Sequence, residues 1–168
     1  MMTSRTLTLK WFLFACATLL VALLDAFALS RISVFGFSPF VFPIMAALAA
    51  SFEGPLQGSF YAMALGVLCD VTLAAPLPCI YTVSFTLCAF VAAALSESVL
   101  RPGLLCSAVV SALSLFITAS FCALVLFFRR GADPTALLGA ALHEVVLSLP
   151  LVLLVHPLFL KIHRKFVF

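Results

Sequence analysis

Residues 102–128 read PGLLCSAVVSALSLFITASFCALVLFF and contain no charged side chain. Roughly 20 predominantly apolar residues cross a bilayer as a helix, so this run is long enough to span one. Two further uncharged runs, 32–52 and 71–96, also reach that length. None of the runs alternates between apolar and polar residues, which favours helices over the strands of an outer-membrane barrel. The sequence therefore predicts an all-α, polytopic membrane protein.

The composition of the whole chain supports this class. Of its 168 residues, 65% are apolar and only 9% are charged, whereas a soluble domain has just under half apolar and about a quarter charged residues. This mismatch excludes a soluble enzyme, a nucleic-acid-binding module and a disordered tail. Helices of about 20 residues use most of the chain, so we expect one integral membrane domain over residues 1–168.

We predict about six membrane-spanning helices, at 11–29, 38–50, 56–75, 80–95, 104–128 and 135–160. The breaks between them carry turn residues, such as Gly54 before Pro55, and Asp133 before Pro134 at the start of the last helix. Pro39 and Pro43 lie near the start of the second helix, where they are expected to shorten or kink that helix.

The distribution of Lys and Arg predicts the orientation, because short cytoplasmic loops carry an excess of both. An even number of spans places both termini on one side, together with six basic residues against three on the other. The six are Arg5, Lys10, Arg101, Lys161, Arg164 and Lys165; the three are Arg31, Arg129 and Arg130. We therefore expect both termini in the cytoplasm.

The predicted spans contain ionisable side chains that are candidates for function, because charge inside a membrane is costly. Asp25, Asp70, His143 and Glu144 all lie in the outer half of the bilayer under the predicted topology, where they are placed to line one polar recess. Structural roles stay equally open. Asp25 is near enough to the interface to pair with Arg31, Asp70 is placed to cap a neighbouring helix, and the other two are placed to form a buried pair.

The third predicted helix carries a stripe in which Gly58, Ala62, Gly66 and Asp70 recur every four residues. Small residues at this spacing let two helix backbones approach closely in a membrane. The stripe is therefore either a packing seam within the chain or a surface that binds a partner helix. A weaker version lies in the last predicted helix, at Ala140, Glu144 and Ser148.

Enzyme and metal signatures are incomplete. His143-Glu144 begins like the zinc motif H-E-x-x-H, but Leu147 stands where the second His is required. Neither a G-x-S-x-G motif nor a Gly-rich phosphate loop occurs. The six cysteines lack C-x-x-C pairs, which favours a role as small packing residues. We expect no catalysis, and no pattern indicates a metal or cofactor.

The stretch Gly58-x-x-x-Ala62-x-x-x-Gly66-Val67-Leu68-x-Asp70, followed by a Pro-rich turn, resembles the rod shape-determining MreD family of bacterial inner-membrane proteins. That family's pattern is roughly G-x-x-x-G-x-x-x-G-L-x-x-D with a further Gly some eight residues on. Here Ala62 replaces one Gly, the spacing from Gly66 to Asp70 is one residue shorter, and Pro78 occupies the place of the later Gly. The chain length, the number of spans and the short basic tail also match.

The resemblance implies a fold similar to the substrate-binding S components of energy-coupling-factor vitamin transporters. It also implies a non-catalytic scaffold of cell-wall elongation in the bacterial inner membrane, which maintains rod shape together with single-span MreC, the wall synthases and actin-like MreB. Association with a second copy of the chain stays open, and no nucleic-acid partner is expected. The alternative is an S-component-like transporter subunit, in which Asp25, Asp70, His143 and Glu144 contact a small molecule.

Overall fold

The computed structural model describes residues 4–27, 39–73, 77–98, 103–131 and 133–166. Within these ranges the chain forms seven α-helices and no strand, which confirms the all-α prediction. The helices are α1 (Ser4–Phe27), α2 (Phe42–Glu53), α3 (Pro55–Thr72), α4 (Ile80–Ser98), α5 (Leu104–Arg130), α6 (Pro134–Ser148) and α7 (Val152–Phe166). A short 3-10 turn, Leu149–Leu151, joins α6 to α7.

Four helical segments are long and apolar enough to cross a membrane: Thr8–Asp25, Ile80–Glu97, Leu104–Arg129 and Thr135–His163. Many large apolar side chains face outward, including Leu19 at 68% and Phe128 at 77% exposure. Such a surface is typical of a protein surrounded by lipid, because soluble monomers rarely expose large continuous apolar patches. The prediction of a multi-pass membrane protein is thus supported by four spans.

The second predicted span differs from the observed helix. The prediction placed it at 38–50, whereas α2 begins at Phe42, has Pro43 in its first turn and ends at Glu53. Proline fits the first turn because its missing N–H has no partner there. With 12 residues, α2 extends about 18 Å, which is less than the hydrocarbon core of about 30 Å. Crossings by α2 and by the 18-residue α3 remain predictions.

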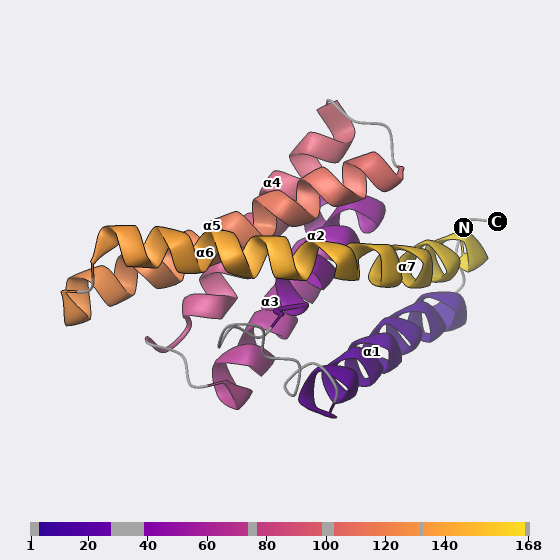
Figure 1. The fold of residues 1–168 in the computed structure, drawn as a ribbon. Coiled ribbons are helices and arrows are strands. Elements are labelled where there is room, and N and C mark those ends of the chain that lie inside the picture. Colours follow the sequence, from indigo (N-terminus) through magenta and orange to yellow (C-terminus); the bar gives the residue numbers. More distant parts are fainter. Residues whose placement is uncertain (1–3, 28–38, 74–76, 99–102, 132, 167–168) are drawn as a thin grey trace.

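The helix α2 occupies the centre of the bundle and packs against α3, α4, α5 and α7 (Figure 1). Every residue from 42 to 50 is buried, and four of these are alanines that allow close helix approach. The rod formed by α6 and α7 crosses the bundle, while α1 lies at its edge and packs on α7. The end where α1 begins therefore lies beside the end where α7 finishes (Figure 1).

The last predicted helix, 135–160, is not one regular α-helix. It is interrupted at Leu149–Leu151, where Pro150 lies in the 3-10 turn between α6 and α7. Proline lacks the N–H that would continue the hydrogen-bond ladder, and its ring crowds the preceding turn. A second proline, Pro157, lies inside α7.

Candidate functional site

The small-residue stripe of α3 lies where this helix meets α2 and α4. A Cβ atom added to Gly58 would lie 2.2 Å from the Cα atom of Ala50, and one added to Gly66 would lie 2.5 Å from the Cα atom of Thr82. Ala62 between them is completely buried. The stripe is therefore a seam closed by other helices of the same chain.

Asp70, at the end of this stripe, caps α4. Its carboxylate accepts hydrogen bonds from the backbone N–H groups of Tyr81 (3.1 Å) and Thr82 (3.0 Å), and from the Thr82 hydroxyl (2.6 Å). The first N–H groups of a helix lack intrahelical partners, and the helix dipole favours negative charge at this end. Asp70 thus accepts hydrogen bonds from the backbone N–H groups at the start of α4, which is the capping role that the sequence left open.

Asp25 and Asp70 lie toward the same end of the bundle. Both carboxylates act electrostatically on the thiol of Cys69, which is buried on α3. Asp25 itself is half-buried near the end of α1. These two predicted site residues therefore belong to the end of the bundle that contains the α3–α4 connection.

His143 and Glu144 have different surroundings although they are adjacent in sequence. Glu144 is half-buried and interacts electrostatically with Tyr81 of α4 and Cys122 of α5. His143 is exposed on α6. In the part of the chain that the structure describes, no group of three His, Cys, Asp or Glu residues is arranged to hold a metal ion.

A buried ionic cluster at the opposite end of the bundle was not predicted. Glu53 of α2 pairs with Lys10 of α1, and its other carboxylate oxygen lies 3.1 Å from Nδ1 of His163 in α7. The side chains of Glu53 and Lys10 are only 3% and 6% exposed. Buried charges are costly unless paired, so this cluster fixes three helices relative to one another. Its signal in the sequence was a charged or titratable residue at the end of each of these helices.

Aromatic and polar contacts extend this cluster inward. The ring of Phe52 packs against His163 and His156, with centroid distances of 5.5 and 5.8 Å. Nδ1 of His156 lies 2.7 Å from the Ser107 hydroxyl of α5. The cluster therefore links α5 to the three helices already joined by Glu53.

One face of α5 is lined with buried hydroxyl groups, which the sequence reasoning also missed. The four are Ser107, Ser111, Ser114 and Thr118. The Ser114 hydroxyl lies 3.1 Å from the carbonyl oxygen of Pro43 and 2.9 Å from that of Ser111, and it donates to these acceptors. The bond to Pro43 joins α5 to α2, and an interhelical bond of this kind contributes on average about 0.6 kcal/mol in a membrane protein. The spacing of three and four residues was the available signal.

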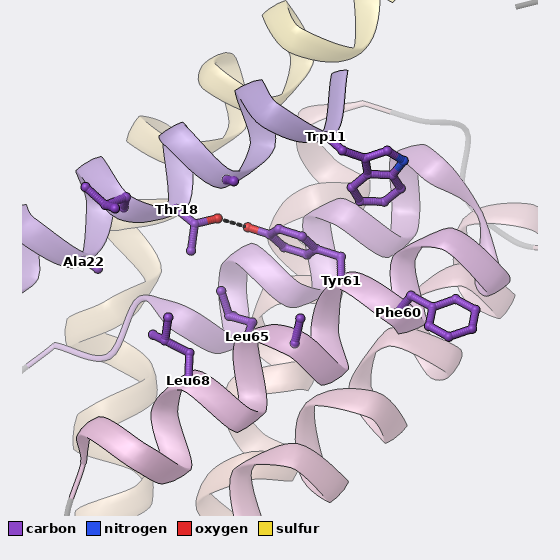
Figure 2. A pocket seen from close by; sticks show the side chains of 10 residues that line it. Trp11, Thr18, Ala22, Phe60, Tyr61, Leu65 and Leu68 are labelled. Carbon is purple, nitrogen blue, oxygen red and sulfur yellow. Dashed lines mark hydrogen bonds between the residues drawn. The ribbon is translucent and has the colours of Figure 1, made fainter. Parts of the chain in front are cut away.

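An apolar groove of about 510 Å³ lies between α1 and α3 (Figure 2). It is lined by Trp11, Ala15, Thr18, Leu19, Ala22, Phe60, Tyr61, Ala64, Leu65 and Leu68. The hydroxyl oxygens of Thr18 and Tyr61 lie 2.5 Å apart and bridge the groove. Because the Thr18 hydroxyl donates to the Phe14 carbonyl at 2.8 Å, Tyr61 is the donor in this bridge.

A second apolar cavity, of about 310 Å³, lies between α5 and α6. Its lining residues are Phe116, Ser120, Ala123, Leu124, Phe127, Leu137, Leu138 and Ala141. Neither cavity is lined by Asp25, Asp70, His143 or Glu144. The four predicted site residues therefore do not contribute to either of these spaces.

Comparisons with protein-family models, with curated proteins and with solved structures find no match for this chain. Its function is therefore inferred from the geometry described above and from the sequence resemblance.

Proposed function

We propose that this protein is a non-catalytic scaffold of the machinery that elongates the bacterial cell wall. It would bind a single-span, MreC-like partner in the inner membrane and link the wall synthases to actin-like MreB, so that the cell keeps its rod shape. The proposal includes six crossings, cytoplasmic termini and an arrangement similar to transporter S components. It is supported by the resemblance of residues 58–70 to the MreD family.

The observation that carries the proposal is the contrast between two small-residue faces. The stripe on α3 is closed by α2 and α4, so it offers no surface to another protein. On α6, by contrast, Ala136 and Gly139 are exposed, and a Cβ added to Gly139 would have no neighbour within 4 Å. Outward-facing small residues let a second membrane helix approach closely. We place the partner helix on this face, with His143 one turn further as a polar contact.

The transporter alternative is less well supported. A ligand site would need the four polar residues to share a cavity, yet both cavities described above are lined by other residues. Asp70 is also engaged by three donors at the start of α4. Its carboxylate would have to leave this cap before it could bind a ligand.

The test is co-purification from native cells in mild detergent, followed by mass spectrometry of every retained protein. We expect a single-span protein and the wall synthases to be recovered with the unmodified chain and with Gly139→Ala. Gly139→Leu should lose them, because its bulk separates the two helices, while Val83→Leu on the outside of α4 should retain them. Recovery of an ATPase pair with a coupling membrane subunit would instead establish the transporter alternative.

A further inference from the structure

The groove between α1 and α3 has the size of a small-ligand site. Its volume of about 510 Å³ falls within the range of roughly 300–1,000 Å³ that is typical of small-molecule pockets. Its two walls are helices that run side by side (Figure 2), so the space between them is long and narrow and is suited to an elongated occupant.

The length and position of the groove match one leaflet of a bilayer. Its lining on α1 extends from Trp11 to Ala22, which is about 16 Å at 1.5 Å per residue. The hydrocarbon of one leaflet is about 15 Å thick. Trp11 lies near the start of the span Thr8–Asp25, at the depth where tryptophan marks the membrane interface. The groove therefore follows the path of an acyl chain.

The chemistry of the walls also favours a hydrocarbon occupant. Leu19 and Phe60 are 68% and 63% exposed on either side of the groove. The two hydroxyl groups within it, those of Thr18 and Tyr61, are already used: Tyr61 donates to Thr18, and Thr18 donates to Phe14. The lining therefore offers no unused hydroxyl proton to a polar ligand.

The end of the molecule where the groove begins is rich in basic residues. The beginning of α1 lies beside the end of α7 (Figure 1), and together these segments contain Arg5, Lys161, Arg164 and Lys165, in addition to Lys10, which is buried and paired with Glu53. Neither segment contains an acidic residue, and nearby Glu53 is engaged by Lys10 and His163. Basic clusters at the cytoplasmic ends of membrane helices attract the headgroups of anionic lipids.

From this volume, length and charge we infer that the groove between α1 and α3 seats an acyl chain of an anionic phospholipid from the leaflet at which α1 begins. The headgroup lies over the basic ends of α1 and α7, and the chain passes Trp11 toward Ala22. This inference is independent of the proposed scaffold function, because it does not depend on which protein binds the bundle.

Trp11 allows a direct test, since it is the chain's single tryptophan and lines the groove. The full-length protein is reconstituted in phosphatidylcholine vesicles that contain increasing fractions of phosphatidylglycerol brominated at acyl carbons 6 and 7. Bromine quenches indole fluorescence on contact. We expect half-maximal quenching at a mole fraction about five-fold lower than with identically brominated phosphatidylcholine, the effect of one basic residue near the surface.

Two variants separate the groove from the headgroup site. Ala64→Phe fills the groove and should raise the half-maximal fraction of brominated phosphatidylglycerol to that of phosphatidylcholine. Val83→Phe, which adds a phenylalanine at an exposed position on the outside of α4, should leave it unchanged. The double change Arg5→Gln and Lys161→Gln should reduce the preference for phosphatidylglycerol but leave the groove open.

Equal quenching by the two lipids in the unmodified protein would overturn the inference, as would identical curves for Ala64→Phe and Val83→Phe. Native mass spectrometry of protein extracted from cells gives a second measurement. A bound phospholipid that is lost in Ala64→Phe and retained in Val83→Phe supports the inference. A retained polypeptide in place of lipid, sensitive to the same change, contradicts it.

Discussion

Gly58 and Gly66 are the residues at which α3 contacts its neighbours through backbone atoms. Gly66→Ala would place a Cβ 2.5 Å from the Cα atom of Thr82, so α3 and α4 must separate. We expect a loss of about 1–3 kcal/mol in unfolding free energy, the usual cost of overpacking, and a larger loss for Gly66→Leu. Titration with SDS in mixed micelles, followed by Trp11 fluorescence, measures this loss.

Gly139→Ala is the matched control for this seam. A Cβ at Gly139 has open space around it, and alanine is the better helix former by about 1 kcal/mol. This variant should therefore be as stable as the unmodified protein or slightly more stable. Equal stability of Gly66→Ala and Gly139→Ala would show that α3 and α4 are not in close contact.

Asp70 is expected to act through the cap of α4. Asp70→Ala removes the acceptors of three hydrogen bonds and should destabilise the protein by about 1–3 kcal/mol. Asp70→Asn keeps one carbonyl oxygen as an acceptor, so its loss should be intermediate. The same SDS titration distinguishes them, and a full effect of Asp70→Asn would indicate that the negative charge itself is required.

At the residue scale, the sequence showed which residues share one face of a helix, but not which residues of other helices pack against that face. The spacing of Gly58, Ala62 and Gly66 identified one stripe because helix geometry alone determines which residues share a face. Ala50 and Thr82 pack against this stripe, but their identity depends on how the helices are arranged in space. The spacing of residues along one helix does not reveal that arrangement. The ion pair of Glu53 with Lys10 joins residues 43 positions apart. A charged residue near the end of each helix marks the candidates, but no local pattern shows that these two side chains meet.

The turn after α3 gives a second example at this scale. Cys79, in the turn before α4, has a positive φ of 65°. Glycine adopts this left-handed region without a steric penalty, whereas other residues rarely do. Residues 73–79 contain no glycine, so the sequence does not indicate which residue of this turn is left-handed.

At the scale of elements, α1 depends on its ion pair. Lys10→Met leaves Glu53 buried with His163 as its remaining partner, which should cost about 3–5 kcal/mol. The double variant Lys10→Met and Glu53→Met removes both charges and should be more stable than the single variant. Lys161→Met, at an exposed position of α7, serves as the control in the same SDS titration. Equal losses for the single and double variants would contradict a buried pair.

Element types were predicted better than element boundaries. The long uncharged runs identified α4 and α5, because a span needs little more than length and hydrophobicity. The same criteria misplaced α2: a 12-residue helix that is buried on every side is as apolar as a helix that faces lipid. The prediction of one helix over 135–160 also missed the 3-10 turn at Pro150, because a proline permits either a kink or a short 3-10 turn.

At the scale of the whole molecule, the proposed orientation is testable through Cys79. This residue is exposed in the turn before α4, at the end of the bundle opposite the ionic cluster. In a variant that retains only Cys79, a membrane-impermeant maleimide should label intact cells from the outside. A variant that retains only Cys16, exposed on the span of α1, should not react, because the reagent does not enter lipid. Labelling of Cys79 only in inverted vesicles would reverse the orientation.

The packing of α1 on α7 has a consequence for biosynthesis. The helix α1 leaves the ribosome before α7, its main packing partner, has been synthesised. At about 5–20 residues per second, roughly 8–30 s separate the synthesis of Lys10 from that of His163. During this interval the insertion machinery or lipid must shield the inner face of α1. Truncation within α7 should therefore leave α1 undocked and deliver the nascent chain to membrane quality-control proteases.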